Sequence, residues 1–269
     1  MSQIAAVVFD WAGTMIDFGC LAPVRALQEA FAQEGVAITE AQVRKDMGKA
    51  KRDHVAALLT DPAVSRAWSE RFGKAPAATD LDRLYAALEP LMLEQAAAHT
   101  TLIPGAADAA AWLARRGVKI GSGTGYTREM MAAILPRAAQ QGYAPSVVVC
   151  AGETKEGRPS PLPMWKALLE LGAYPAWRCV KVDDAVVGIQ EGRAAGAWTI
   201  GVAASGNGVG LGLEAWTALS ESERRSRKAA AEQSLLDAGA DYVMATVADL
   251  PDVLVDIERR IAANDRPKL

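Results

Sequence analysis

The stretch AAVVFDWAGTMID, residues 5–17, decides the fold of this chain. Its apolar run ends in Asp10, and the turn that follows contains Gly13 and Thr14. A continuous apolar run of this kind is typical of a strand that is buried on both faces of a parallel sheet. Open α/β sheets bind ligands at the carboxyl ends of their strands, so we expect Asp10 at a ligand site. The alternative is a strand followed by an aspartate in a solvated turn.

The rest of the chain shows two patterns, one after the other. Between residues 23 and 100 the apolar residues recur almost entirely at helical spacing. From residue 104 onward, short apolar strands alternate with helices, which is typical of βαβ units in a parallel sheet. We therefore predict an α/β fold with a doubly wound, Rossmann-like parallel-sheet core at residues 1–20 and 100–269. An α-helical cap domain is expected as an insertion at residues 21–99.

The elements of the core can be placed approximately from these patterns. The expected strands are short apolar runs at residues 4–10, 118–122, 146–150, 178–182, 198–202 and 241–245. The expected helices begin or end at Gly, Pro or a capping residue, at residues 104–116, 127–141, 161–171, 186–195 and 220–238, and a final helix closes the chain.

The composition of the 269-residue chain excludes several classes of protein. A formal net charge of −3 selects neither nucleic acid nor an anionic membrane, and the basic cluster at residues 224–228 is expected on a solvated helix face. The three cysteines are widely spaced without a CxxC pair, which argues against a disulfide framework and a structural zinc site. No apolar run approaches the roughly 18 residues of a membrane span. No signal peptide is expected, so we predict a cytoplasmic protein.

Polar side chains follow several predicted strands and are expected to share one edge of the sheet. They are Asp10, Ser122 with Thr124, Arg158, and Asp183 with Asp184. Acids at two strand ends can share Mg²⁺, which prefers oxygen ligands. A hydroxyl and a guanidinium can hold phosphoryl oxygens, and the first carboxylate can attack phosphorus to form an aspartyl phosphate. The structural alternatives are a helix cap, a turn hydroxyl and a surface arginine.

This order of motifs resembles the haloacid dehalogenase superfamily and, more narrowly, its phosphonoacetaldehyde hydrolase (phosphonatase) family. The narrower resemblance covers essentially the whole chain. The strings that carry it are FDWAGT at 9–14, DFGC at 17–20, MGKAKRDH at 47–54, TGYTREMM at 124–131, EGRP at 156–159 and GAWT at 196–199. The resemblance implies a Mg²⁺-dependent hydrolase that splits the C–P bond of phosphonoacetaldehyde into acetaldehyde and phosphate.

Two residues favour the narrower family on chemical grounds. Ordinary superfamily phosphatases carry a second Asp two residues after the nucleophile, as acid and base for an oxygen leaving group, and here that residue is Ala12. A broken C–P bond leaves its electron pair on carbon, so an electron sink is needed instead. Lys51 can be that sink, because a neutral amine condenses with an aldehyde to an iminium. The alternative is that Lys51 is a solvated helix lysine.

The resemblance also implies roles for the remaining site residues. Asp10 is the nucleophile, and Mg²⁺ is held by the Asp10 carboxylate, the Ala12 backbone carbonyl and Asp184, with Asp183 a candidate to act through water. The residues expected to bind the phosphoryl group or line the substrate site are Thr124, Arg158, Gly48, Tyr126, Met47, Cys20 and His54. The implied partners are a small phosphonate substrate and a second copy of the chain, as a homodimer formed through the caps.

The last motif departs from the family pattern. One version of it has Gly-Asp with another Asp four residues after the first, whereas residues 183–188 read DDAVVG. The later acid is replaced by Gly188, and an extra acid, Asp183, precedes Asp184, so the direct metal ligand stays open. A capped phosphomonoesterase that acts on a small organic phosphate is the alternative function. A non-catalytic scaffold is a further alternative, and Gly188 is the feature that favours it.

Overall fold

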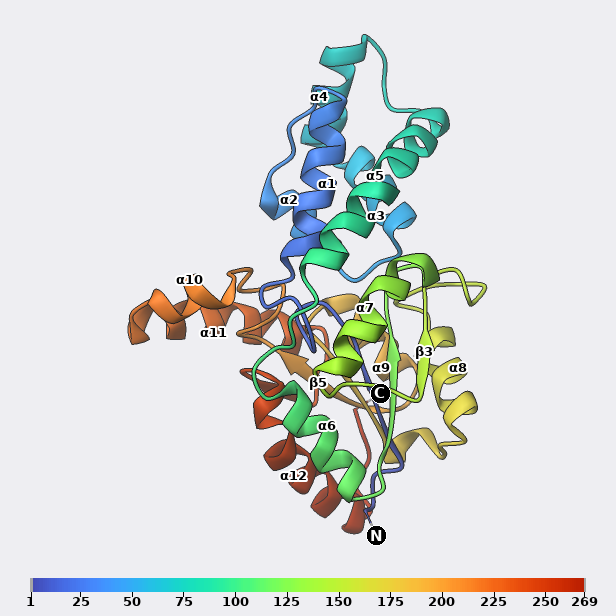
Figure 1. Cartoon of the computed structure of the whole chain (residues 1–269), viewed down its shortest axis with the longest axis vertical. Coiled ribbons are helices and arrows are strands. Elements are labelled where there is room, and N and C mark those ends of the chain that lie inside the picture. Colours follow the sequence, from blue (N-terminus) through green and yellow to red (C-terminus); the bar gives the residue numbers. More distant parts are fainter. Residues whose placement is uncertain (1, 269) are drawn as a thin grey trace.

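The computed structural model describes residues 2–268, and its centre is a parallel sheet with the strand order β3-β2-β1-β4-β5-β6 (Figure 1). The strands are β1 (Ala6–Phe9), β2 (Lys119–Gly123), β3 (Val147–Val149), β4 (Cys179–Asp183), β5 (Trp198–Val202) and β6 (Tyr242–Met244). Each lies within a predicted range or one residue beyond it, which confirms the doubly wound sheet. The outer ends of the predicted core, residues 1 and 269, lie outside the described residues.

Helices cover both faces of this sheet. They are α6 (Ala106–Arg115), α7 (Arg128–Gln140), α8 (Leu162–Leu171), α9 (Val186–Ala194), α10 (Leu213–Ala218), α11 (Glu221–Asp237) and α12 (Leu250–Ala262), with 3-10 turns η1 (Ala176–Arg178) and η2 (Val247–Asp249). Side chains alternate along a strand, so Val7 and Phe9 of β1 join the core that contains α6, α7 and α12. Ala6 and Val8 join the opposite core, which contains α8. All four side chains are buried, as the apolar run predicts.

The helices between β1 and α6 form a bundle of their own, which stands above the sheet in Figure 1. They are α1 (Leu21–Gln33), α2 (Glu40–Lys45), α3 (Lys51–Thr60), α4 (Pro62–Phe72) and α5 (Ala78–Ala98). Trp68 of α4 is fully buried, with its ring centroid 4.6 Å from that of Phe72 and 6.4 Å from that of Phe31. Trp68 therefore belongs to the core of the bundle.

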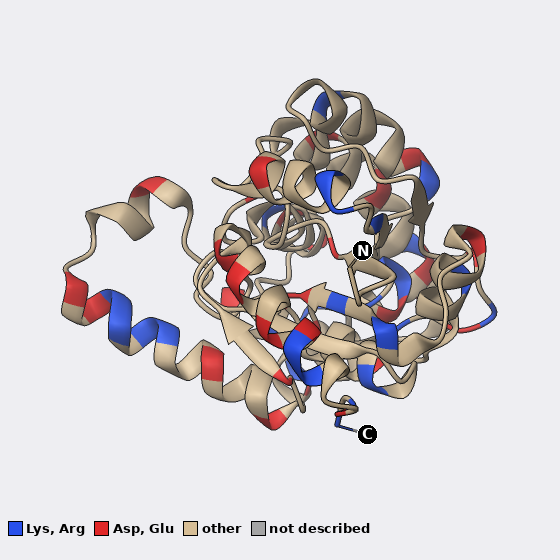
Figure 2. Ribbon diagram, turned by 90° about the horizontal axis from the view of Figure 1, so that it is seen from below, with Lys and Arg blue, Asp and Glu red and all other residues tan. Residues whose placement is uncertain are grey.

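The outer surface carries charges of both signs (Figure 2). The basic cluster at residues 224–228 lies on α11, where Arg225 faces Glu221 and Lys228 faces Glu232, each pair 3.4 Å apart. This largely exposed, ion-paired face is the solvated helix face that the sequence predicts. Within residues 2–268, no helix combines the length and the apolar character that crossing a membrane would require.

The strand order places a crevice between β1 and β4. β1 pairs in parallel with β2 on one side and with β4 on the other, and the chain builds outward from each. Ligands of open α/β sheets bind at such a point, beyond the carboxyl ends of the strands. Asp10 follows β1 directly, and Asp184 follows β4 directly. The fold therefore brings the predicted acids to one edge.

Candidate active site

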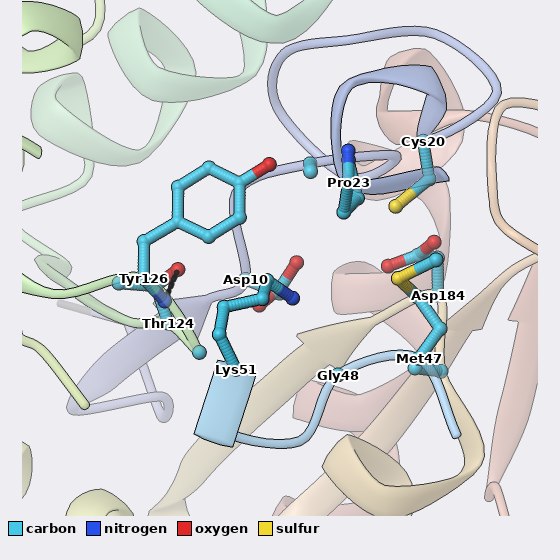
Figure 3. A pocket seen from close by; sticks show the side chains of 12 residues that line it. Asp10, Cys20, Pro23, Met47, Gly48, Lys51, Thr124, Tyr126 and Asp184 are labelled. Carbon is cyan, nitrogen blue, oxygen red and sulfur yellow. Dashed lines mark hydrogen bonds between the residues drawn. The ribbon is translucent and has the colours of Figure 1, made fainter. Parts of the chain in front are cut away.

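A small cavity lies at this edge, between the sheet and the helical bundle (Figure 3). Its lining residues come from the strand ends and from the bundle with its entry loop; they are Asp10, Ala12, Cys20, Pro23, Met47, Gly48, Lys51, Thr124, Gly125, Tyr126, Asp184 and Ala185. All the site residues proposed from the sequence are in this set except Arg158, Asp183 and His54. The cavity therefore joins residues that lie more than a hundred positions apart in the chain.

Asp10 is held at the cavity by the strand that precedes it. Its backbone N–H donates to the carbonyl of Val182 at 2.9 Å, which continues the pairing of β1 with β4. Its carboxylate accepts a hydrogen bond from Nη1 of Arg158 at 2.6 Å. Burial, followed by repulsion from Asp183, raises the pKa of Asp10 to about 6, while Arg158 opposes the rise. At pH 7 the carboxylate is mostly ionised, as a nucleophile must be.

Asp184 shares the cavity with Asp10 and is fixed by two loops. Its Oδ2 accepts a hydrogen bond from the Asn207 N–H at 2.7 Å, and its Oδ1 accepts one from the Thr14 hydroxyl at 3.3 Å. Gly13 has a φ of 84°, and a Cβ at that position would overlap the Asp184 carboxylate, so this turn requires glycine. Burial, with Asp10 close by, raises the pKa of Asp184 well above its ordinary value.

The acids at this edge form a donor set that fits a divalent cation. Ligand atoms of Asp10, Asp183 and Asp184 lie within 4.8 Å of one another, and all three residues are buried. Asp10, Asp184 and Ala12 line the cavity, whereas Asp183 does not. Carboxylate and carbonyl oxygens are the ligands that Mg²⁺ prefers. A bound cation would also offset the repulsion that raises the pKa values of Asp10 and Asp184.

Arg158 belongs to a buried charge network beside the cavity. Its guanidinium lies 2.6 Å from Asp10, 3.1 Å from Glu191 and 3.3 Å from Asp183. Its Nη2 also donates to the Gly123 carbonyl at 2.6 Å. Although burial disfavours the charged guanidinium, Asp183, Asp10 and Glu191 hold the pKa of Arg158 above its ordinary value. The alternative of a surface arginine is therefore wrong.

The network contains two residues that sequence reasoning missed. Nζ of Lys181 lies 2.8 Å from Glu191 and 3.2 Å from Asp183, and these side chains are at most 1% exposed. A signal was present, because Lys181 interrupts an apolar strand and a buried ammonium requires carboxylate partners. Glu191 lies on α9, so its pairing with Lys181 follows from the packing of α9 against β4 and not from the strand pattern.

Lys51 brings an amine from the helical bundle into the cavity. It is the first residue of α3, its side chain is 3% exposed, and its Nζ lies 5.4 Å from the centroid of the Tyr126 ring. Burial lowers the pKa of Lys51 and Arg158 adds to this, whereas Cys20 and Asp10 oppose it. The positive end of the α3 dipole also disfavours the ammonium. The alternative of a solvated helix lysine is therefore wrong.

His54 lies elsewhere than the sequence prediction placed it. Its ring is fully buried, and Nε2 is 2.7 Å from the carbonyl of Val43, outside the cavity lining. Burial, together with the charge of Lys51, lowers the pKa of His54 to about 3, so the ring is neutral and donates to that carbonyl. His54 therefore ties α3 to the end of α2, one turn after Lys51.

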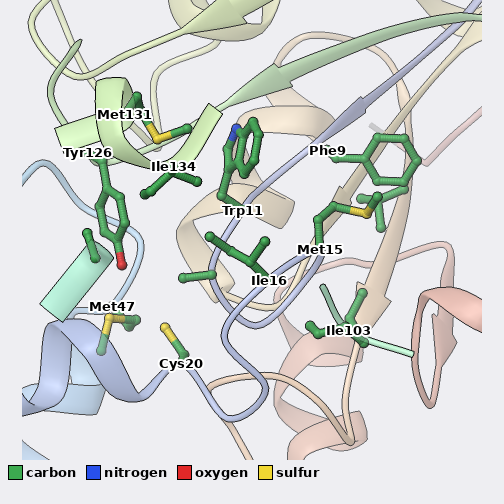
Figure 4. Close-up of a cluster of buried hydrophobic side chains, with 14 of the residues drawn as sticks. Phe9, Trp11, Met15, Ile16, Cys20, Met47, Ile103, Tyr126, Met131 and Ile134 are labelled. Carbon is green, nitrogen blue, oxygen red and sulfur yellow. The ribbon is translucent and has the colours of Figure 1, made fainter. Parts of the chain in front are cut away.

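The apolar side of the cavity continues into the core. Cys20, Met47 and Tyr126 line the cavity and belong to one cluster of buried side chains (Figure 4). Below them, Trp11 donates from Nε1 to Oγ of Ser122 at 2.9 Å, so this hydroxyl is engaged inside the core. Thr124 lines the cavity, whereas Ser122 does not.

Glycines allow the bundle to approach the core closely. A Cβ on Gly125 would lie 2.6 Å from the carbonyl oxygen of Lys49, and one on Gly48 would meet Val187 and Ala185. The loop that leads into Lys51 therefore rests on the loops that follow β2 and β4. This contact places the lysine and the nucleophile in one enclosed site.

The chain belongs to the haloacid dehalogenase-like hydrolases, because the sequence model of that family matches residues 4–196. The fold and the strand-end acids described above agree with this class.

Within the class, the chain is similar to proteins named phosphonoacetaldehyde hydrolase. It is 48% identical to one from Paraburkholderia phytofirmans, covering 99% of this chain and 100% of the relative. It is 44% identical to one from Hahella chejuensis, covering 98% and 90%. The crystal structure of a phosphonoacetaldehyde hydrolase-like protein from Oleispira antarctica matches with a TM-score of 0.97 at 43% identity, covering 98% of this chain and 96% of the other. These similarities place the chain in the phosphonoacetaldehyde hydrolase family.

Proposed function

We propose that this chain hydrolyses the C–P bond of phosphonoacetaldehyde to give acetaldehyde and phosphate. The observation that supports this most directly is that the buried amine of Lys51 and the carboxylate of Asp10 line one cavity. Residue 12 is Ala, so the cavity offers no acid at the position from which an oxygen leaving group would be protonated.

In the proposed mechanism, Lys51 and Asp10 divide the covalent work. The neutral amine of Lys51 adds to the aldehyde, and loss of water gives an iminium ion. Asp10 attacks phosphorus, the C–P bond breaks, and its electron pair enters the iminium to form an enamine. Protonation of the enamine carbon and hydrolysis of the imine release acetaldehyde and regenerate Lys51. Water then hydrolyses the aspartyl phosphate, releasing phosphate from Asp10.

Charge on the transferring group is offset from the core side of the cavity. Arg158 is fixed beside Asp10, and Thr124 lines the cavity, so both are proposed to hold phosphoryl oxygens. Mg²⁺, held by the carboxylates of Asp10 and Asp184 and the carbonyl of Ala12, would supply further positive charge there.

We also propose that residues 21–99 act as a cap domain over the core. Lys51 comes from this segment and Asp10 from the core, so substrate entry requires the two to separate and closure brings them together. The proposed hinges are Gly19, whose φ is 92°, and residues 100–101. A homodimer and a cytoplasmic location remain predictions, and light scattering of the purified chain would measure the first.

The decisive experiment measures acetaldehyde released from phosphonoacetaldehyde in the presence of Mg²⁺. We expect Lys51→Arg to lower the rate at least about 10³-fold, because it removes a covalent catalyst. Lys49→Arg is the matched control, since Lys49 is paired with Asp46 at 2.6 Å and does not line the cavity. Borohydride added with substrate should attach a reduced adduct to Lys51 in the wild type and in Lys49→Arg.

Three results of this experiment would contradict the proposal. A Lys51→Arg protein with the native rate would overturn the Schiff-base mechanism. A wild type that releases phosphate from small phosphate esters, but no acetaldehyde, would favour the phosphomonoesterase alternative. A wild type inert to both substrates would favour the scaffold alternative.

A further inference from the structure

The two departures from the family's last motif lie next to each other in space. Asp183 is the last residue of β4, and Gly188 is in the first turn of α9, which packs against β4. A Cβ built on Gly188 would overlap the carboxyl carbon and both carboxylate oxygens of Asp183. Protein interiors do not tolerate such overlap, so residues 183 and 188 share one volume. Only one of these two positions can carry a side chain into it.

The Asp183 carboxylate that fills this volume is engaged by three donors. Its Oδ1 accepts the N–H of Ala185 at 3.0 Å, and its Oδ2 lies 3.2 Å from Nζ of Lys181 and 3.3 Å from Nη1 of Arg158. The residue is fully buried and does not line the cavity, in contrast to Asp184. Asp183 therefore faces the charge network, where it helps to hold the guanidinium that contacts Asp10.

We propose that Asp183 and Gly188 are a reciprocal exchange of one carboxylate. The acid that the family motif carries at the later position is supplied in this chain from the end of β4, into the same space. Asp183 is then a positioning residue for Arg158, and Asp184 remains the acid at the cavity. Its catalytic part rests on the function proposed above, whereas the sharing of one volume does not.

Thermal stability tests the shared volume without substrate or metal. Gly188→Ala in the wild type forces a Cβ into the Asp183 carboxylate, and we expect the melting temperature to fall by roughly 2–8 °C. In the Asp183→Gly background the same substitution has room, and alanine is the better helix former, so the effect should be neutral or stabilising. Equal losses in the two backgrounds would overturn the exchange.

Turnover tests the positioning role. Asp183→Gly should lower kcat by about 10–100-fold, with a smaller change in KM, because Arg158 loses a partner that orients it. Gly188→Asp places two carboxylates in one volume and should also be impaired. The double variant Asp183→Gly with Gly188→Asp restores the motif pattern, and its kcat should exceed that of both single variants.

A double variant no more active than the weaker single variant would overturn the positioning role of Asp183. If the wild type releases no acetaldehyde, the proposed function fails, whereas the two melting-temperature differences still decide whether residues 183 and 188 share their volume.

Discussion

The Asp10 carboxylate is charged at neutral pH although it is buried, and this has a consequence for stability. Its pKa in the folded protein is about 6, above the ordinary value of 3.8. Between these values the folded protein holds a proton that the unfolded chain releases, so the free energy of unfolding falls as pH rises from about 4 to about 6.

Asp10→Asn should therefore separate activity from stability. We expect it to lower turnover at least about 10³-fold, because the nucleophile is lost. Without metal at pH 8, it should raise the free energy of unfolding by up to roughly 3 kcal/mol, and the gain should shrink towards pH 4. Calorimetry in a chelator at the two pH values measures this. A gain that is equal at both would contradict the assignment of the charge to Asp10.

A second prediction at this scale concerns Asp184 and the cation. Saturating Mg²⁺ should raise the melting temperature of the wild type by several degrees, because a ligand at about 100 times its Kd adds about 2.7 kcal/mol. Asp184→Asn should abolish the rise together with turnover. Asp237→Asn, which changes an exposed acid on α11, is the control and should keep both. A full Mg²⁺ response in Asp184→Asn would exclude this residue as a ligand.

At the scale of elements, the strands could be predicted from the sequence, whereas some helices and contacts could not. Each strand is a short apolar run, because both faces of the sheet are covered. The six-residue helix α10 was not predicted, because it lies between a glycine-rich stretch and the Ser220 cap of α11 and buries none of its residues.

Partners across elements were equally hidden from the sequence. Its pattern placed Asp10, Thr124 and Asp184 at strand ends, where burial and direction follow from the strand itself. It did not show that His54 turns to Val43, because helical spacing does not say which neighbour a buried ring meets. Nor could it show that the space left by Gly188 holds the Asp183 carboxylate.

Contact between the loop at 46–50 and the loop after β2 leads to a prediction for Gly125. We expect Gly125→Ala to lower kcat/KM roughly tenfold, because its Cβ meets the Lys49 carbonyl and pushes Lys51 away from Asp10. The melting temperature should change little, since the clash is relieved by opening. Gly157→Ala is the control, as a Cβ there meets nothing within 4 Å. Unchanged kinetics in Gly125→Ala would show that this contact does not limit closure.

At the scale of the whole molecule, the bundle and the core are joined by Arg44 at the end of α2. Its guanidinium donates to the carbonyls of Gly19 and Gly210, each at 3.0 Å, and to Oδ1 of Asn207 at 3.1 Å. Asn207 returns a hydrogen bond to the Arg44 carbonyl at 2.9 Å, and its own N–H holds Asp184. One arginine of the bundle thus contacts a proposed hinge and the loop that fixes a proposed metal ligand.

Arg44→Ala should therefore shift the molecule towards an open arrangement. Hydrogen bonds to a charged group contribute about 1.5–3 kcal/mol each, so losing this set should lower the closed population and kcat/KM at least roughly tenfold. Small-angle X-ray scattering should show a larger radius of gyration than in the wild type. Arg83→Ala is the matched control, because Arg83 pairs with Glu34 and Asp80 inside the bundle. If Arg44→Ala scatters and turns over like Arg83→Ala, the contacts of Arg44 do not govern closure, and the glycine-lined contact beside Lys51 would have to hold the two parts together.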